Sequence, residues 1–111
     1  LYNEAKVNID DIAERILTLG EKPVGHWSSY LDIADIKEAK ADLNDVGMVS
    51  EVLDNHRIII ENLRKSISIA NDISDESTAD MMIAMLQNVE KNSWMLSSWK
   101  KGIETHAAVT A

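Results

Sequence analysis

The sequence of 111 residues predicts an all-α protein. Three observations support this class: apolar residues recur at helical spacing in three long segments, turn residues separate these segments, and the composition suits helices. Alanine, leucine, isoleucine, methionine, glutamate and lysine are common, whereas phenylalanine is absent and proline occurs once. Because 45% of the residues are apolar, the chain can form a core, and its length suits one small domain.

The first long helix is predicted from Tyr2 to Leu19. Its apolar residues are spaced by three or four positions, at Tyr2, Ala5, Ile9, Ile12, Ile16 and Leu19. Gly20 is expected to end the helix, and Pro23 prevents it from continuing. No capping residue precedes Leu1, and the apolar pattern is already in phase there. We therefore expect the chain to begin inside a helix, with a further helix upstream.

Residues 20–43 form a long connection to the next helix. At roughly 3.3 Å per extended residue it can span about 75 Å, whereas an 18-residue helix is only about 27 Å long. The connection can therefore return along the bundle and start the next helix in parallel, which is the ferritin-like arrangement of a four-helix bundle. A short helix through Tyr30 to Ile33, capped by Ser28 or Ser29, is expected within it.

Two more long helices are predicted from about Asp45 to Asn71 and from Ser74 or Asp75 to about Lys101. Methionines of the second of these lie at core spacing, where filling of gaps is the ordinary role and haem ligation the rarer one; they are Met81, Met82 and Met85.

The end of the chain carries a glycine and then loses its apolar period. Gly102 is expected to close the last helix, so that residues 1–104 form the helical domain and residues 105–111 a mobile tail. These helices supply three of the four that a bundle needs, and an exposed apolar groove is expected where the missing one belongs.

Composition excludes several classes of function. The absence of cysteine rules out disulfides, thiolate metal sites and cysteine catalysis. A small protein without cysteine suits a reduced compartment, so we expect a cytoplasmic location. No apolar run approaches the length of a membrane span, so we expect no membrane contact. The net charge of −8 argues against DNA binding, because a duplex footprint requires a basic surface.

Asp10 and Glu14 form a pair of carboxylates on the predicted first helix. At 100° per residue, both lie nearly opposite the apolar stripe. Val7 and Leu17 lie on the same far face, which indicates an interface as an alternative to a solvated acidic surface. Two carboxylates held in an interface repel each other unless a cation or a proton separates them. A divalent ion with oxygen and imidazole ligands would suit them.

The stretch DDIAERILTLGEKPVG resembles the Dps family of mini-ferritins, which carry a D-x-x-x-E-R-x-x-x-x-G-x-x-P pattern at the end of their second bundle helix. SSYLDIADIKE is similar to the short connecting helix of that family and the acidic turn after it. The segment from His56 to Trp99 resembles its third and fourth helices, including the T-A-D and E-K-x-x-W-M-L patterns. The resemblance covers nearly all of residues 1–105.

The resemblance implies a ferroxidase that stores iron. Dps-like proteins form dodecameric shells, bind Fe(II) at two-fold interfaces, oxidise it with hydrogen peroxide or oxygen, and keep the ferric mineral inside. By this resemblance Asp10 and Glu14 are catalytic metal ligands, and a neighbouring subunit supplies two histidines and one carboxylate. The resemblance also places a second acidic cluster around a three-fold pore for iron entry; its members are Asp72, Asp75, Glu76 and Asp80. Helix-start electrostatics is the simpler role for that cluster.

The three histidines of the chain do not replace the missing ligands. We expect His26 to lie in the connection, His56 to be hydrogen-bonded near the core, and His106 to be exposed in the tail. The sequence thus holds half of a metal site. The alternative function is therefore a helical oligomerisation module without chemistry, derived from a truncated relative.

Overall fold

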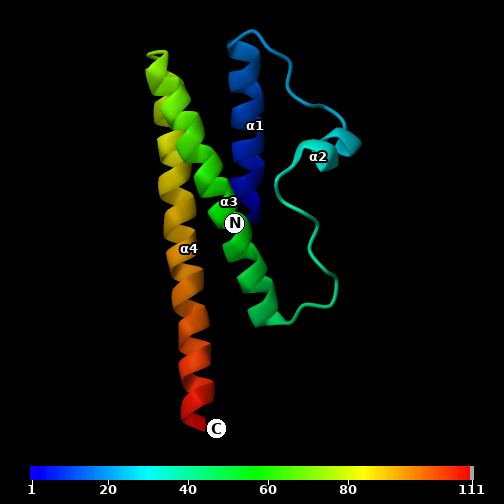
Figure 1. The fold of residues 1–111 in the computed structure, drawn as a ribbon, viewed down its shortest axis with the longest axis vertical. Coiled ribbons are helices and arrows are strands. Elements are labelled where there is room, and N and C mark those ends of the chain that lie inside the picture. Colours follow the sequence, from blue (N-terminus) through cyan, green and yellow to red (C-terminus); the bar gives the residue numbers. More distant parts are fainter. Residues whose placement is uncertain (111) are drawn as a thin grey trace. The chain divides into compact units, whose positions relative to one another are not determined.

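A computed structural model describes residues 1–110, and the regular elements in that range are four helices (Figure 1). The helices are α1 (Tyr2–Thr18), α2 (Trp27–Ile33), α3 (Asp45–Asp72) and α4 (Glu76–Thr110). The predicted all-α class, with a short helix inside a long connection, is confirmed. The chain divides into two compact units, Leu1–Lys37 and Glu38–Ala111, and each is described by itself.

The first unit begins with α1, and the predicted stop after it is confirmed. Leu19 is the C-terminal cap, and Gly20 follows with a positive φ of 90°. The amide of Gly20 donates to the Leu17 carbonyl at 3.0 Å, and the amide of Glu21 donates to the Ile16 carbonyl at 3.1 Å. These two bonds form a Schellman motif, which satisfies carbonyls that the end of a helix leaves open.

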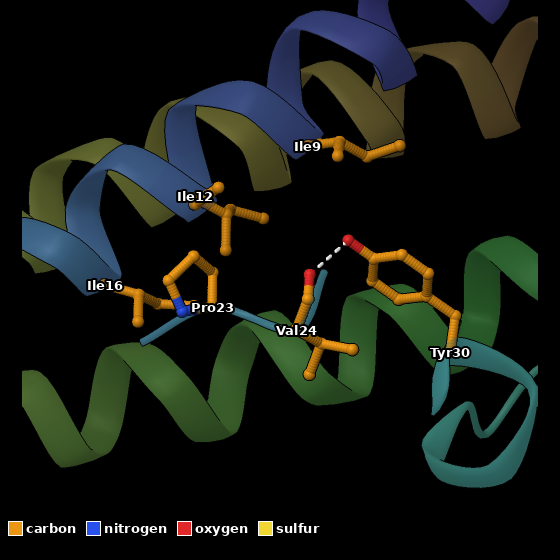
Figure 2. A pocket seen from close by; sticks show the side chains of 7 residues that line it. Ile9, Ile12, Ile16, Pro23, Val24 and Tyr30 are labelled. Carbon is orange, nitrogen blue, oxygen red and sulfur yellow. Dashed lines mark hydrogen bonds between the residues drawn. The ribbon is translucent and has the colours of Figure 1, made fainter. Parts of the chain in front are cut away.

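The connection after α1 folds back against the apolar stripe of that helix (Figure 2). Together they line a cavity of about 220 Å³, whose walls come from Ile9, Ile12, Ala13, Ile16, Pro23, Val24 and Tyr30. The Tyr30 hydroxyl donates to the Val24 carbonyl at 2.5 Å, so the polar end of this ring has a partner inside the unit. The apolar stripe of α1 is therefore the side of the helix that faces the connection.

The short helix α2 starts earlier than the sequence predicts. It begins at Trp27, and its cap position is His26, which makes no capping bond through its side chain. The expectation that Ser28 or Ser29 caps this helix is therefore wrong. An edge-to-face contact between the rings of Trp27 and Tyr30, with centroids 6.2 Å apart, spans the first turn of the helix. The contact thus involves Trp27, which a cap at Ser28 or Ser29 would have left outside the helix.

The second unit starts its regular structure at α3, one residue after a side-chain cap. The Asn44 side chain accepts a hydrogen bond from the Gly47 amide at 2.7 Å. A Cβ atom at Gly47 would lie only 3.0 Å from the Asn44 Oδ1 atom, so the absence of a side chain at this position gives the cap its room. The predicted start of this helix at Asp45 is confirmed.

The turn between α3 and α4 is a second Schellman motif, which here uses a serine. Ser74 has a φ of 58°, a left-handed conformation that is uncommon outside glycine. The amides of Ser74 and Asp75 donate to the carbonyls of Asn71 and Ala70, respectively, at 3.1 and 2.8 Å. Asp75 then caps α4, because its carboxylate accepts from the amide of Thr78 at 3.2 Å and from its hydroxyl at 2.5 Å. Asp75 thus takes part in both helix ends, through its amide at the end of α3 and through its carboxylate at the start of α4.

The core of the second unit lies between α3 and α4, which run side by side (Figure 1). Its buried residues are Leu63, Ala70, Ala79 and Met85. The two alanines, Ala70 and Ala79, lie near the turn in sequence, one in each helix. The predicted core position of Met85 is confirmed.

The end of α4 differs from the sequence prediction. The helix continues through Gly102 to Thr110, so the expectation that Gly102 closes it is wrong. A single glycine costs a helix only about 1 kcal/mol relative to alanine. Lys100 and Glu104, whose charged atoms are 3.9 Å apart, span this glycine as an i, i+4 pair. Whether residues 105–110 are mobile stays a prediction, and Ala111 lies outside the described residues.

Many large apolar side chains are exposed in both units. Trp27 is 87% exposed, Trp94 68%, and Ile73 71%, whereas the core of the second unit is small. The expected apolar groove in place of a further helix stays a prediction. Among residues 1–110, no helix has the length and apolar character that crossing a membrane requires.

Candidate metal centre

Asp10 and Glu14 lie on one exposed side of α1. Both belong to a regular helix, so their positions at i and i+4 place the two carboxylates one turn apart. The apolar stripe of α1 faces the cavity of the first unit, and the carboxylates therefore lie on the side turned away from it (Figure 2). Val7 and Leu17, on that same side, are 55% and 58% exposed.

The two carboxylates have no cationic partner in residues 1–110. No ion pair or side-chain hydrogen bond engages them there, although Lys6 precedes Asp10 by one helical turn. The Glu14 backbone carbonyl, by contrast, accepts a bond from the Thr18 hydroxyl at 2.9 Å. Carboxylate oxygens are suitable ligands for a divalent cation, and here they are open to one.

The pair is not a complete site within the described chain. In residues 1–110, no three histidine or carboxylate side chains come together closely enough to hold a metal ion. Two ligands from one helix leave most of a coordination shell to other groups. As a metal site the pair would need a second surface to supply the remaining ligands, and the predicted half-site stays a prediction.

The second acidic cluster, Asp72, Asp75, Glu76 and Asp80, divides into two kinds of residue. Asp75 is half-buried and uses both carboxylate oxygens to cap α4, so its role is structural. Asp72, Glu76 and Asp80 are exposed at the turn and the first turns of α4. Glu76 and Asp80 are four residues apart and share a side of the helix, which leaves them as the better candidates for attracting cations.

The three histidines lie where the sequence suggests. His26 is exposed before α2, and His106 is exposed near the end of α4. His56 is half-buried, and its Nδ1 atom lies 2.8 Å from the Ser93 Oγ atom. Burial lowers the pKa of His56 below its usual value of 6.5, because a charged ring loses hydration there. The expectation of a hydrogen-bonded histidine near the core is confirmed.

Sequence reasoning missed the interactions inside the connection. The bond from Tyr30 to Val24 ties α2 to the connection before it, and the ring contact between Trp27 and Tyr30 lies within α2 itself. The only signal in the sequence is the presence of two aromatic residues three positions apart beside a proline-containing segment. That signal fits many loops, so it could not have identified this packing.

Comparison with known proteins agrees with this arrangement of helices. Residues 1–105 match the ferritin-like domain family, and the chain therefore belongs to that family. General stress protein 20U of Bacillus subtilis is 40% identical over 99 residues, which cover 89% of this chain and 68% of that protein. DNA protection during starvation protein 2 of Bacillus anthracis is 37% identical over 99 residues, which again cover 89% of this chain and 68% of that protein. Within the ferritin-like family, the chain is a Dps mini-ferritin.

Solved structures show the same fold. The crystal structure of Dps from Staphylococcus aureus has a TM-score of 0.86 and 36% identity, covering 89% of this chain and 66% of that one. Dps from Vibrio cholerae O1, described as a member of a broad superfamily of ferritin-like diiron-carboxylate proteins, also has a TM-score of 0.86, at 33% identity and with 88% and 62% covered. The chain thus spans about two thirds of the length of these relatives. The predicted ferritin-like fold is confirmed.

Proposed function

We propose that this chain is a subunit of an iron-oxidising and iron-storing shell. Fe(II) is the substrate, hydrogen peroxide or oxygen the oxidant, and ferric mineral the stored product. The carrying observation is the exposed, unpartnered pair Asp10 and Glu14 on the side of α1 turned away from the apolar stripe. Membership in the Dps mini-ferritins supports the proposal, because a relative in that group is described as a diiron-carboxylate protein.

The carboxylates have two roles in this proposal. They bind Fe(II) through oxygen atoms, and their negative charge favours the ferric product over the ferrous substrate, since a higher cationic charge is attracted more strongly. Peroxide takes two electrons, one from each of two ferrous ions. A second subunit completes the ligand shell with histidines and a further carboxylate, and twelve subunits form the shell.

The test is a double substitution, Asp10→Asn with Glu14→Gln. Both changes keep shape and helix propensity but remove the charged ligands, so oxidation of Fe(II) by peroxide should slow by about tenfold or more. Ferric absorbance after mixing measures the rate, and light scattering checks that the assembly has the mass of twelve subunits.

The matched control is Glu4→Gln with Asp11→Asn. This variant removes the same charge from the same helix, about 60° to 120° around its axis from the proposed ligands, and should keep the oxidation rate. Equal rates in both variants and the unchanged protein would contradict the proposal. A chain that assembles but never accelerates oxidation over buffer would instead support the alternative, a helical oligomerisation module.

DNA binding is proposed to be absent from the surface of this chain, although relatives are called DNA protection during starvation proteins. The chain carries 19 acidic against 11 basic residues, which gives a repulsive field toward phosphates. A gel-shift experiment at low salt with duplex DNA checks this. A shift that disappears on raising the salt would contradict it.

A further inference from the structure

We infer that Lys6 tunes the affinity of the Asp10–Glu14 half-site for its metal ion; this inference rests on the proposed function. Lys6, Asp10 and Glu14 are four residues apart in succession, so they form one row along an exposed side of α1. The row places a fixed positive charge at one end of the two proposed ligands. Lys6 thereby acts as a tethered competitor for an incoming cation.

The structure shows that this lysine is close in position but not engaged. In residues 1–110, Lys6 makes no ion pair or side-chain hydrogen bond, and neither do the two carboxylates. A lysine that precedes its acid by four residues is the weaker orientation of a helical ion pair, which agrees with an open arrangement. A divalent ion can therefore bind the carboxylates without first breaking a salt bridge.

The charge of Lys6 nevertheless opposes the bound metal. Side chains at i and i+4 lie about 6 Å apart, and at this distance in water one ammonium shifts an equilibrium involving a unit charge by about threefold. The opposition grows wherever a second subunit excludes water from the face, because the effective dielectric constant falls there. Without metal, the same charge reduces the repulsion between the carboxylates.

Three variants test the inference in the protein at its native length and assembly. Lys6→Gln removes the charge, Lys6→Arg keeps it, and Lys37→Gln removes an equal charge from an exposed position outside α1. Calorimetric titration with Zn(II), a redox-inert probe, measures affinity apart from oxidation. We expect Lys6→Gln to bind up to about tenfold more tightly at low salt, because Zn(II) carries twice the unit charge. The gain should vanish near 1 M salt, where screening acts within about 3 Å.

The expected result includes unchanged affinities for Lys6→Arg and Lys37→Gln. A Lys6→Gln variant that binds Zn(II) as the unchanged protein does, or more weakly, would overturn the inference. The Asp10→Asn, Glu14→Gln protein separates this failure from failure of the proposed function. If that variant still binds Zn(II) and oxidises Fe(II) normally, the proposed half-site itself is wrong.

Discussion

His56 shows how one hydrogen-bonded residue joins two long helices. The Ser93 hydroxyl donates to the Val89 carbonyl at 2.8 Å, so it can only accept from the Nδ1 atom of His56, also at 2.8 Å. The Nδ1 atom therefore carries a proton in both the neutral and the charged ring. The bond fixes the positions of α3 and α4 relative to each other at a point between the buried side chains and the open end of the pair.

The lowered pKa of His56 predicts a loss of stability on acidification. The unfolded chain binds this proton more readily than the folded chain, so the free energy of unfolding falls as the pH drops from about 6.5 toward the lowered pKa. The variant His56→Asn keeps a donor for Ser93 but does not titrate. Urea unfolding followed between about pH 7.5 and pH 5 should show a steeper loss in the unchanged protein than in the variant. Parallel curves would contradict this role.

At the scale of the helices, glycine has opposite meanings in α1 and α4. Gly20 follows α1 with a φ of 90°, where a side chain is strained, whereas Gly102 lies inside α4. A Cβ atom at either position meets no other atom within 4 Å, so backbone conformation alone separates the two cases. The same residue type therefore ends one helix and is only tolerated in the other.

Alanine substitutions at these two glycines should change stability in opposite directions. Gly102→Ala should stabilise the last part of α4 by up to about 1 kcal/mol, because alanine is the better helix former. Gly20→Ala should destabilise the first unit by about 1 kcal/mol, because it forces a left-handed conformation on a residue with a side chain. Amide hydrogen exchange of residues 103–110 and 16–21 measures the two effects locally. Destabilisation by Gly102→Ala would show that the helix ends there after all.

At the scale of the whole molecule, more large apolar side chains are exposed than buried. The core of the second unit is made of a few residues of α3 and α4, while large apolar side chains such as Trp94 and Ile73 remain open to solvent. We propose that copies of the turn between α3 and α4 meet in the proposed shell, so that their acidic side chains would form a ring that attracts Fe(II).

The ring predicts an effect on iron entry that is separate from oxidation chemistry. The double variant Glu76→Gln, Asp80→Asn should slow mineral formation by up to about tenfold when Fe(II) is dilute, because the local concentration of cations at the entry falls. The effect should shrink as salt rises. Iron content per shell over time, measured against a Glu38→Gln, Asp42→Asn control in the exposed connection, checks this. Equal filling in the two variants would exclude an entry role for the cluster.

The sequence by itself determined the helical class and most helix limits. Apolar spacing, the Gly20–Pro23 stop and a cap at Ser74 or Asp75 depend on contacts within a few residues, which the sequence displays directly, and the structure selects Asp75. It also placed Asp10 and Glu14 opposite the apolar stripe, because helical geometry is regular. The motif around them indicated the family that the comparisons then showed.

Only the tertiary structure decided the remaining features, because they depend on contacts between residues distant in the chain or on a small balance of energies. Tyr30 reaches back to Val24, and His56 meets Ser93 across 37 residues, which no local pattern encodes. The continuation of α4 through Gly102 reflects a cost of about 1 kcal/mol that the rest of the helix exceeds. The early start of α2 is accompanied by a ring contact between Trp27 and Tyr30, which a search for capping residues does not detect.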